Sequence, residues 1–211
     1  AGAANVVGIV AAYVEGGFSY IVTERCDQTL LQYLEGLPRL DEDTLKPAIR
    51  GMLAGIAAAH AAGVVHRDVK PDNYLCQQGT VKLCDFGLAA SVASADRFEL
   101  KDIVGTPAFM APEILSHDPY NGLVDMWSFG VVVYCLFFGA FPYTPKERTG
   151  PAMMEAVHAG TPAPSFLPSP EAEARRVPPG EQAAAAGCRR SSPSAVSAEA
   201  LRFAKKLLRR R

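Results

Sequence analysis

The stretch His66-Arg67-Asp68-Val69-Lys70-Pro71-Asp72-Asn73 decides how this chain is interpreted, together with the later tripeptide Asp85-Phe86-Gly87. The two segments combine carboxylates, a carboxamide and an amine at a spacing that suits a magnesium ion and a phosphate beside a hydroxyl nucleophile. Taken singly, each residue has a plainer explanation, such as a loop carboxylate, a turn residue or a helix cap. Their joint spacing is what favours a functional site.

Four further segments follow in a fixed order. They are Gly105-Thr106-Pro107, Ala111-Pro112-Glu113, Asp125-Met126-Trp127-Ser128-Phe129-Gly130 and Gly139-Ala140-Phe141-Pro142-Tyr143. With the first two motifs, they resemble the eukaryotic protein kinases, and specifically the serine/threonine branch. The resemblance covers the chain from about Ile21 to Tyr143.

The resemblance implies an α+β, protein-kinase-like fold with a mainly helical C-terminal lobe and a two-stranded remnant of the N-terminal lobe. A Gly-rich loop, a strand lysine and a helix glutamate belong to the family's signature. None is found here, since the first lysine is Lys46 and Gly16-Gly17 reads as a hairpin turn. Asn5-Val6-Val7 resembles the loop that follows the glutamate-bearing helix, and the chain lacks an initiator methionine. We therefore expect a kinase fragment that begins just beyond those parts.

Four segments are expected along the chain: 1–26 as the N-lobe remnant and hinge, 27–160 as the C-lobe, 161–197 as an insert, and 198–211 as a truncated C-lobe helix. Apolar runs rich in β-branched and aromatic residues, joined by Glu15-Gly16-Gly17, predict an antiparallel pair of strands over 6–13 and 18–23. Helical periodicity predicts helices over 29–34, 41–62, 153–159 and 198–210. His60, inside the second of these, is interpreted as a packing residue.

Proline, alanine and serine dominate the insert, which predicts disorder. Its serines beside Arg189-Arg190 are candidate phosphorylation sites or simply solubilising residues: Ser191, Ser192 and Ser194. The basic end, 205–211, is interpreted as the solvated face of a helix, with a localisation or phosphate-binding patch as the alternative.

The 211 residues carry a net charge of −1, with 49% hydrophobic and 20% charged residues. This balance gives no general attraction to nucleic acid or to an anionic membrane, and we expect neither partner. Five scattered cysteines form no C-x-x-C pair and suit a reducing, intracellular compartment, with the cytoplasm as the expected location. The apolar run from Met126 to Phe141 is interpreted as a buried helix and not as a membrane span.

The resemblance assigns the chemistry residue by residue. It makes Asp68 the catalytic base and Lys70 the group that neutralises charge on the transferred phosphoryl. Asn73 and Asp85 become the Mg²⁺ ligands. It places four residues around the adenine of ATP. Thr23 guards the pocket behind the ring, Glu24 and Cys26 belong to the hinge whose backbone groups bond it, and Leu75 forms the apolar floor beneath it.

The same resemblance implies a regulatory set. Arg67 precedes the catalytic aspartate and in such kinases receives an activation-segment phosphate, and the position of the usual acceptor is occupied here by Asp102. We hypothesise that Asp102 partly substitutes for phosphate, the alternative being a solvated loop aspartate. The other members of the activation segment are Phe86, Gly87, Thr106 and Glu113. Three residues are assigned structural roles: His66, Asp125 and Trp127.

The sequence therefore predicts a protein serine/threonine kinase that uses ATP and Mg²⁺ to phosphorylate a protein hydroxyl. Residues 1–211 alone are expected to turn over weakly or not at all. The alternative is a non-catalytic kinase-fold scaffold or binding module. The protein substrate, the upstream regulator and the oligomeric state stay open.

Overall fold

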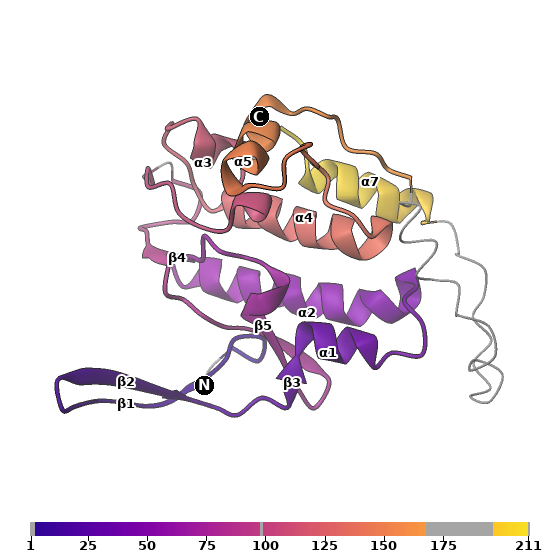
Figure 1. The fold of residues 1–211 in the computed structure, drawn as a ribbon. Coiled ribbons are helices and arrows are strands. Elements are labelled where there is room, and N and C mark those ends of the chain that lie inside the picture. The colour runs from indigo at the N-terminus through magenta and orange to yellow at the C-terminus, as the bar shows by residue number, and fades with distance from the viewer. Residues whose placement is uncertain (1–2, 98, 168–195, 211) are drawn as a thin grey trace.

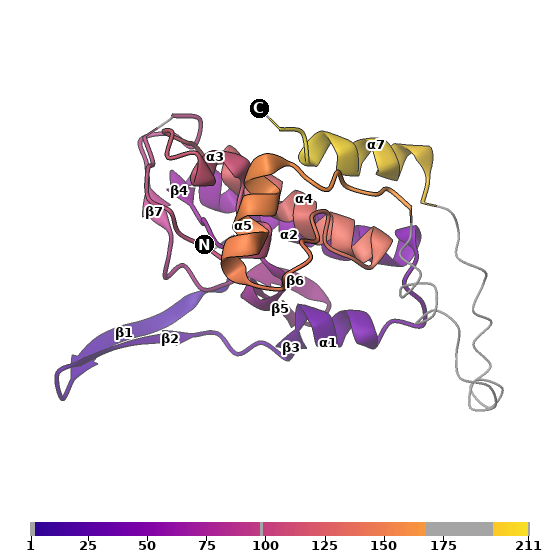
Figure 2. The same ribbon diagram turned by 45° about the horizontal axis from the view of Figure 1, so that its top comes forward.

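The structure is a computed structural model that describes residues 3–97, 99–167 and 196–210 (Figure 1). Strands β1 (Ile9–Glu15) and β2 (Phe18–Thr23) form an antiparallel hairpin, closed by Gly16 and Gly17 in left-handed conformations. The expected hairpin is confirmed, although its first strand begins at Ile9. All strand positions are exposed, and the hairpin stands apart from the helical body (Figures 1 and 2).

Two small sheets frame the motif-bearing loops. Strand β5 (Tyr74–Gln77) pairs with β3 (Gln28–Thr29) on one side and with β6 (Thr80–Leu83) on the other. Strand β4 (Val64–Val65) pairs with β7 (Ala90–Ser91). The loop from His66 to Asn73 thus runs between β4 and β5, and β6 leads into Asp85.

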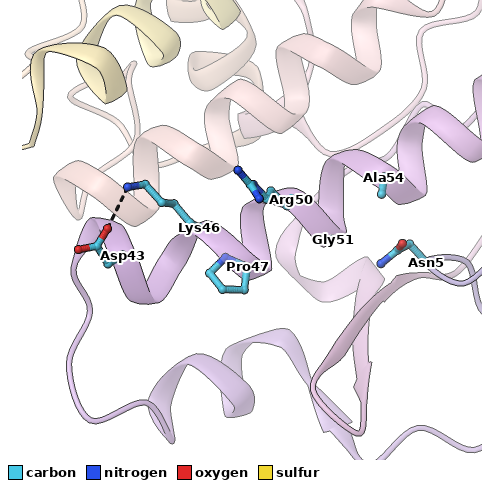
Figure 3. Close-up of a pocket in the computed structure, with 7 residues that line it drawn as sticks. All are labelled: Asn5, Asp43, Lys46, Pro47, Arg50, Gly51 and Ala54. Atoms are coloured by element: carbon cyan, nitrogen blue, oxygen red, sulfur yellow. Dashed lines mark hydrogen bonds and ion pairs between the residues drawn. The ribbon is translucent and has the colours of Figure 1, made fainter.

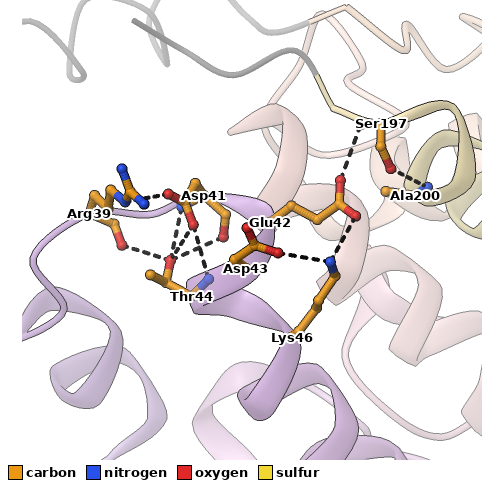
Figure 4. A network of polar contacts seen from close by, with 8 residues as sticks. All are labelled: Arg39, Asp41, Glu42, Asp43, Thr44, Lys46, Ser197 and Ala200. Carbon is orange, nitrogen blue, oxygen red and sulfur yellow. Dashed lines mark hydrogen bonds and ion pairs between the residues drawn. The ribbon is translucent and has the colours of Figure 1, made fainter. Parts of the chain in front are cut away.

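Helices α1 (Leu30–Glu35) and α2 (Glu42–Ala61) confirm the periodicity of the sequence. Each begins with a capping box, at Thr29 and at Asp41, so the first free backbone N–H groups of each helix are satisfied. Figure 4 shows the network at the start of α2, where the Glu42 carboxylate accepts a hydrogen bond from the backbone N–H of Ser197, at 3.1 Å. Ser197 in turn caps α7 (Ala198–Leu207), so this contact joins two helices far apart in sequence.

Helix α4 (Leu123–Phe138) lies in the middle of the lobe and contacts both α2 and α7 (Figure 1). It is apolar nearly all round because its faces are covered by neighbours, which confirms the buried-helix interpretation. Gly130 permits the close approach of α7, since a Cβ there would lie 2.7 Å from the Leu207 Cβ. No helix in the described part of the chain is long and apolar enough to cross a membrane.

The lobe is completed by α3 (Pro112–Leu115) and α5 (Gly150–Ala159). The sequence indicated that the basic end of the chain is solvated, but two of its residues make contacts within the lobe. The Arg210 guanidinium donates to the carbonyls of Val157 and His158 at the C-terminus of α5, where a cation is favoured. Lys205 lies 5.0 Å from the centroid of the Phe166 ring.

The expected insert is only partly described, because residues 168–195, with the three candidate serines and Cys188, lie outside the described residues. Its first part packs on the lobe: the Phe166 ring lies 5.5 Å from Tyr134 and 5.7 Å from Phe138. The packed lobe therefore extends past the expected boundary at 160, to at least Phe166.

Candidate active site

The loop that begins at His66 is held by the buried carboxylate of Asp125, in the first turn of α4. Asp125 Oδ2 accepts the backbone N–H of His66 at 2.8 Å, and Oδ1 accepts that of Arg67 at 2.7 Å. Arg67 has a φ of 67°, a left-handed conformation that is uncommon for a residue other than glycine. The carboxylate thus fixes an unusual backbone conformation directly before Asp68.

His60 contributes a third contact to the same carboxylate, with its Nε2 at 2.7 Å from Asp125 Oδ2. His60 does pack, since a Cβ at Gly122 would lie 3.1 Å from its Cε1, but the interpretation as a packing residue missed this polar contact. The sequence offered no signal for this pair, because its members are 65 positions apart.

Asp68 lies at the centre of a polar cluster with three neighbours. Its Oδ2 lies 2.7 Å from Lys70 Nζ, and its Oδ1 accepts the Thr106 hydroxyl at 2.7 Å. The Thr106 oxygen accepts from Lys70 Nζ at 2.9 Å, and Asn73 Nδ2 donates to Asp68 Oδ2 at 3.1 Å. Burial alone raises the pKa of Asp68, but the hydrogen bonds from Lys70 and Thr106 outweigh it, so this pKa lies below its ordinary value. The structure thus keeps an ionised carboxylate beside an amine and a hydroxyl.

The segment of Asp85 is tied to this loop on both sides. The backbone N–H of Cys84 donates to the carbonyl of Asn73 at 3.0 Å, and His66 Nε2 donates to the carbonyl of Cys84 at 3.0 Å. The Phe86 ring meets the His66 ring edge-on, with centroids 4.9 Å apart. These contacts hold the backbone on either side of Asp85 against the loop of residues 66–73.

The side-chain oxygens of Asn73 and Asp85 are donors of the kind that a magnesium ion shared with a nucleotide takes. Magnesium in such sites takes one or two protein carboxylates or amides and completes its shell with phosphate oxygens and water. Asn73 uses its amide nitrogen toward Asp68, which leaves the amide oxygen as a possible ligand. Among the described residues, no group of three or more His, Cys, Asp or Glu side chains is placed to hold a metal by itself. A divalent ion at this place would therefore need ligands besides these side chains, such as phosphate oxygens and water.

The positions expected around adenine lie where β2 ends and the chain crosses to β3. The amide of Glu24 donates to the Gly8 carbonyl at 2.9 Å, so it is not free to bind a nucleotide. The Glu24 carboxylate lies 2.7 and 2.8 Å from Lys82 Nζ on β6, an ion pair that the sequence analysis missed. Leu75 on β5 is the strand partner of Lys82 on β6, the residue that binds Glu24. Burial raises the pKa of Cys26. Thr23 ends β2 immediately before this crossing.

A surface depression of about 550 Å³ lies elsewhere, along the exposed side of α2 (Figure 3). Its lining combines charged and small residues: Asn5, Asp43, Lys46, Pro47, Arg50, Gly51 and Ala54. None of them lies in the segments 66–73, 85–87 or 105–113, so the depression is separate from the candidate active site.

The activation segment is attached to the loop through Arg67. Its Nη1 lies 3.0 Å from Asp102 Oδ2, and its Nε donates to the carbonyl of Leu88 at 2.7 Å. The Tyr120 hydroxyl donates to the Asp102 carbonyl at 2.6 Å. The contact that the Asp102 hypothesis requires is therefore present.

Three other expected residues have structural surroundings. Gly87 donates its N–H to Asp85 Oδ1 at 3.3 Å, as part of the turn after that residue. Trp127 stacks on Tyr143 with centroids 6.2 Å apart, and its Nε1 is buried without a hydrogen-bond partner among the described residues. Glu113, half-buried in α3, forms no ion pair within the described part of the chain.

Comparison with known proteins agrees with this geometry. The sequence matches the protein kinase domain over residues 2–211. It is 39% identical over 132 residues to a probable serine/threonine-protein kinase of Encephalitozoon cuniculi, covering 63% of this chain and 25% of that protein. It is 34% identical over 140 residues to the serine/threonine-protein kinase TIO of Arabidopsis thaliana, covering 66% and 10%. For the serine/threonine-protein kinase PAK 4 of Mus musculus the identity is 39% over 140 residues, covering 66% and 23%. The matched part is thus a quarter or less of each relative's length. Because the domain match spans nearly the whole sequence, the chain belongs to the protein kinase family, and these relatives come from its serine/threonine branch.

Proposed function

We propose that this chain carries the catalytic loop and metal-binding segment of a protein serine/threonine kinase. The reaction is the transfer of the γ-phosphoryl group of ATP to a serine or threonine hydroxyl of a protein. The bond between the γ-phosphorus and the bridging oxygen of ADP breaks while the substrate oxygen bonds to phosphorus. The observation that carries the proposal is the cluster of Asp68, Lys70 and Thr106 beside the segment of Asp85.

In this proposal Asp68 accepts the hydrogen bond of the incoming hydroxyl and then its proton. An ionised carboxylate is needed for that role, and the lowered pKa of Asp68 supports it. Lys70 neutralises charge on the transferred phosphoryl group. The Thr106 hydroxyl, which touches both residues, shapes the position of the substrate side chain.

The residues that would hold Mg²⁺ are Asn73 and Asp85. When bound, the ion would neutralise charge on the phosphates of ATP. Thr23, Glu24, Cys26 and Leu75 would surround the adenine. The ion pair between Glu24 and Lys82 would fix the hinge relative to β6, the strand that leads to Asp85. It would thus set the distance between the adenine end and the metal end of the nucleotide site.

A magnesium-dependent thermal shift tests the nucleotide site. ATP with Mg²⁺ should raise the melting temperature of the chain, since a ligand that binds only the folded state stabilises it by mass action. Asp85→Asn should abolish the magnesium-dependent part of the shift, while the exposed control Asp118→Asn should keep it. Equal shifts with and without Mg²⁺ in the unsubstituted chain would contradict the proposal.

Turnover is the second part of the test. The chain contains no Gly-rich loop and no lysine before Lys46, so phosphate-holding groups of the family signature are absent from it. We therefore propose weak or no turnover for residues 1–211. Radiolabelled ATP and a generic protein substrate measure this, with Asp68→Asn as the inactive control. Robust turnover that is lost in Asp68→Asn would overturn the expectation of low activity.

A non-catalytic binding module is the second candidate function. The exposed β1–β2 hairpin favours it, because both faces of an apolar two-stranded sheet are open. No magnesium-dependent nucleotide binding and no turnover would together support this candidate.

We also propose that Asp102 partly substitutes for a phosphate group by pairing with Arg67, and so helps to hold the activation segment in place. The pair is only partly shielded, since the Asp102 side chain is 72% exposed, and it contributes little to global stability. Asp102→Ala should therefore leave the melting temperature nearly unchanged but increase proteolytic cleavage between 96 and 105. Asp118→Ala serves as the matched control. Identical cleavage rates for both variants would refute the role of Asp102.

A further inference from the structure

Helix α7 carries positive charge on the side that faces away from the lobe. From Arg202 to Arg210 the sequence has five cations and no acidic residue. All five cations are exposed, whereas Ala200, Ala204 and Leu208 are buried. Figures 1 and 2 show α7 at the edge of the lobe, on one side of α4. The helix thus has an apolar face against the lobe and a charged face toward solvent.

Two of the five cations are bound within the lobe. Arg210 donates to two carbonyls at the end of α5, and the Arg202 guanidinium lies 2.7 Å from the Glu199 carboxylate. These contacts leave three cations whose charge no acidic side chain neutralises.

The remaining three cations form a basic face, which consists of Lys205, Lys206 and Arg209. Lys205 Nζ lies 5.0 Å from the centroid of the Phe166 ring, a contact that holds the ammonium group without neutralising it. Lys206 and Arg209 form no hydrogen bond or ion pair with any residue that the structure describes. Lys206 also lies one helical turn from Arg202, and like charges at this spacing repel each other. A bound anion would relieve this repulsion.

The basic face stands on a firmly packed support. Ala204 is 0% exposed, and α7 approaches α4 so closely that a Cβ at Gly130 would lie 2.7 Å from the Leu207 Cβ. Because the backbone that carries these cations is already fixed, a ligand would have to order only their side chains.

The opposite end of α7 is acidic. Glu199 lies in its first turn, and Glu42 accepts a hydrogen bond from its capping residue Ser197 (Figure 4). Lys46 is shared between Glu42, at 3.5 Å, and Asp43, at 2.9 Å, so this end keeps negative charge. A long polyanion lying along α7, such as a nucleic acid or an anionic membrane, would meet these carboxylates. A short acidic segment at the other end would not.

We propose that the basic face of α7 is a docking surface for a short acidic segment of another protein. The cations at 205, 206 and 209 cover about 6 Å along the helix axis. In an extended peptide, side chains on one side repeat at roughly the same distance, about 6.6 Å, so glutamates at alternate positions match the basic face. The net charge of −1 conceals this surface, because it sums opposite charges from the two ends of α7 and from the rest of the chain. The proposal is independent of phosphoryl transfer.

Fluorescence anisotropy on the whole chain tests the proposal. The probe is a fluorescein-labelled peptide in which three glutamates alternate with alanine, and the same peptide with glutamine in place of glutamate is the neutral reference. The acidic peptide should bind at low salt and be released in about 1 M NaCl, where the screening length falls to about 3 Å. The neutral peptide should not bind.

The double variant Lys206→Gln with Arg209→Gln should weaken binding of the acidic peptide about five-fold, since two exposed ion pairs are lost. Lys146→Gln with Arg148→Gln is the matched control, because it removes the same two charges from exposed positions elsewhere and should leave binding unchanged. No binding of the acidic peptide, or equal binding to both double variants, would overturn the proposal.

Competition separates a short acidic segment from a long polyanion. Unlabelled acidic peptide should displace the probe, while a single-stranded oligonucleotide and vesicles containing phosphatidylserine should displace it less well at equal concentration of negative charge. Stronger displacement by either polyanion would overturn the assignment to an acidic protein segment. These measurements need no turnover, so an inactive kinase leaves them intact.

Discussion

Replacing Gly105 with alanine should destabilise the protein where residue 105 packs against the backbone of Arg67. Gly105 has a φ of +115°, and a Cβ there would lie 2.6 Å from the carbonyl oxygen of Arg67. Backbone strain and the forced contact each cost about 1–3 kcal/mol. Since part of this is relieved by local movement, we expect Gly105→Ala to lower the free energy of unfolding by about 2–4 kcal/mol. Urea unfolding followed by the fluorescence of Trp127 measures it, because this single, buried tryptophan reports on the lobe.

Gly79→Ala is the matched control for this substitution. Gly79 also has a positive φ, of +78°, but a Cβ there would meet nothing within 4 Å. Its cost should therefore be backbone strain alone, about 1–2 kcal/mol. If the two variants lose equal stability, the close approach of Gly105 to Arg67 does not constrain the protein, and the reasoning fails.

Three further outcomes are expected. The pKa of Asp68 lies below its ordinary value because hydrogen bonds outweigh burial, so its stabilising contribution is present above the unfolded pKa and is lost as the pH falls through the folded one. The difference in urea stability between the unsubstituted chain and Asp68→Asn should thus be constant near neutral pH and shrink below about pH 4, and a gap that persists in strong acid would contradict this. Burial raises the pKa of Cys135 to about 12. Mass spectrometry should therefore show that iodoacetamide alkylates Cys135 at pH 8 at least about a hundred-fold more slowly than free cysteine. Comparable rates would show an accessible thiolate. Val14 and Ile21 are 74% and 68% exposed, so the double change Val14→Thr with Ile21→Thr should reduce binding of an apolar dye and self-association in light scattering, while Ser19→Thr should not. No reduction would mean that the hairpin is covered in solution.

Much of the fold could be predicted from local patterns. The helix over 41–62 follows from apolar residues at three- and four-residue spacing, and its capping residue Asp41 is visible in the sequence. The hairpin over 6–23 follows from β-branched residues on either side of two glycines. The start of the insert was less predictable, because a single aromatic residue, Phe166, packs on α4 within an otherwise proline-rich stretch.

The candidate site also has residues that could be predicted from the sequence and contacts that could not. Motif spacing and the resemblance predict Asp68, Asn73 and Asp85 as one site, and the structure joins Asn73 directly to Asp68. The partners of Glu24 and His60 were not predictable, since the sequence separates each pair by more than 55 positions. The capping of α5 by Arg210 is a third case of this kind.

By itself, the sequence determined the chain's family, the order of its main helices and strands, and the acidic segments that would face a nucleotide. These features depend on short-range spacing, which is written along the chain. Only the tertiary structure decided that His60 holds Asp125, that Lys82 holds Glu24 and that Asp102 meets Arg67. A donor or acceptor has the same chemistry wherever it stands, and its partner is chosen by how helices and strands distant in sequence pack against one another.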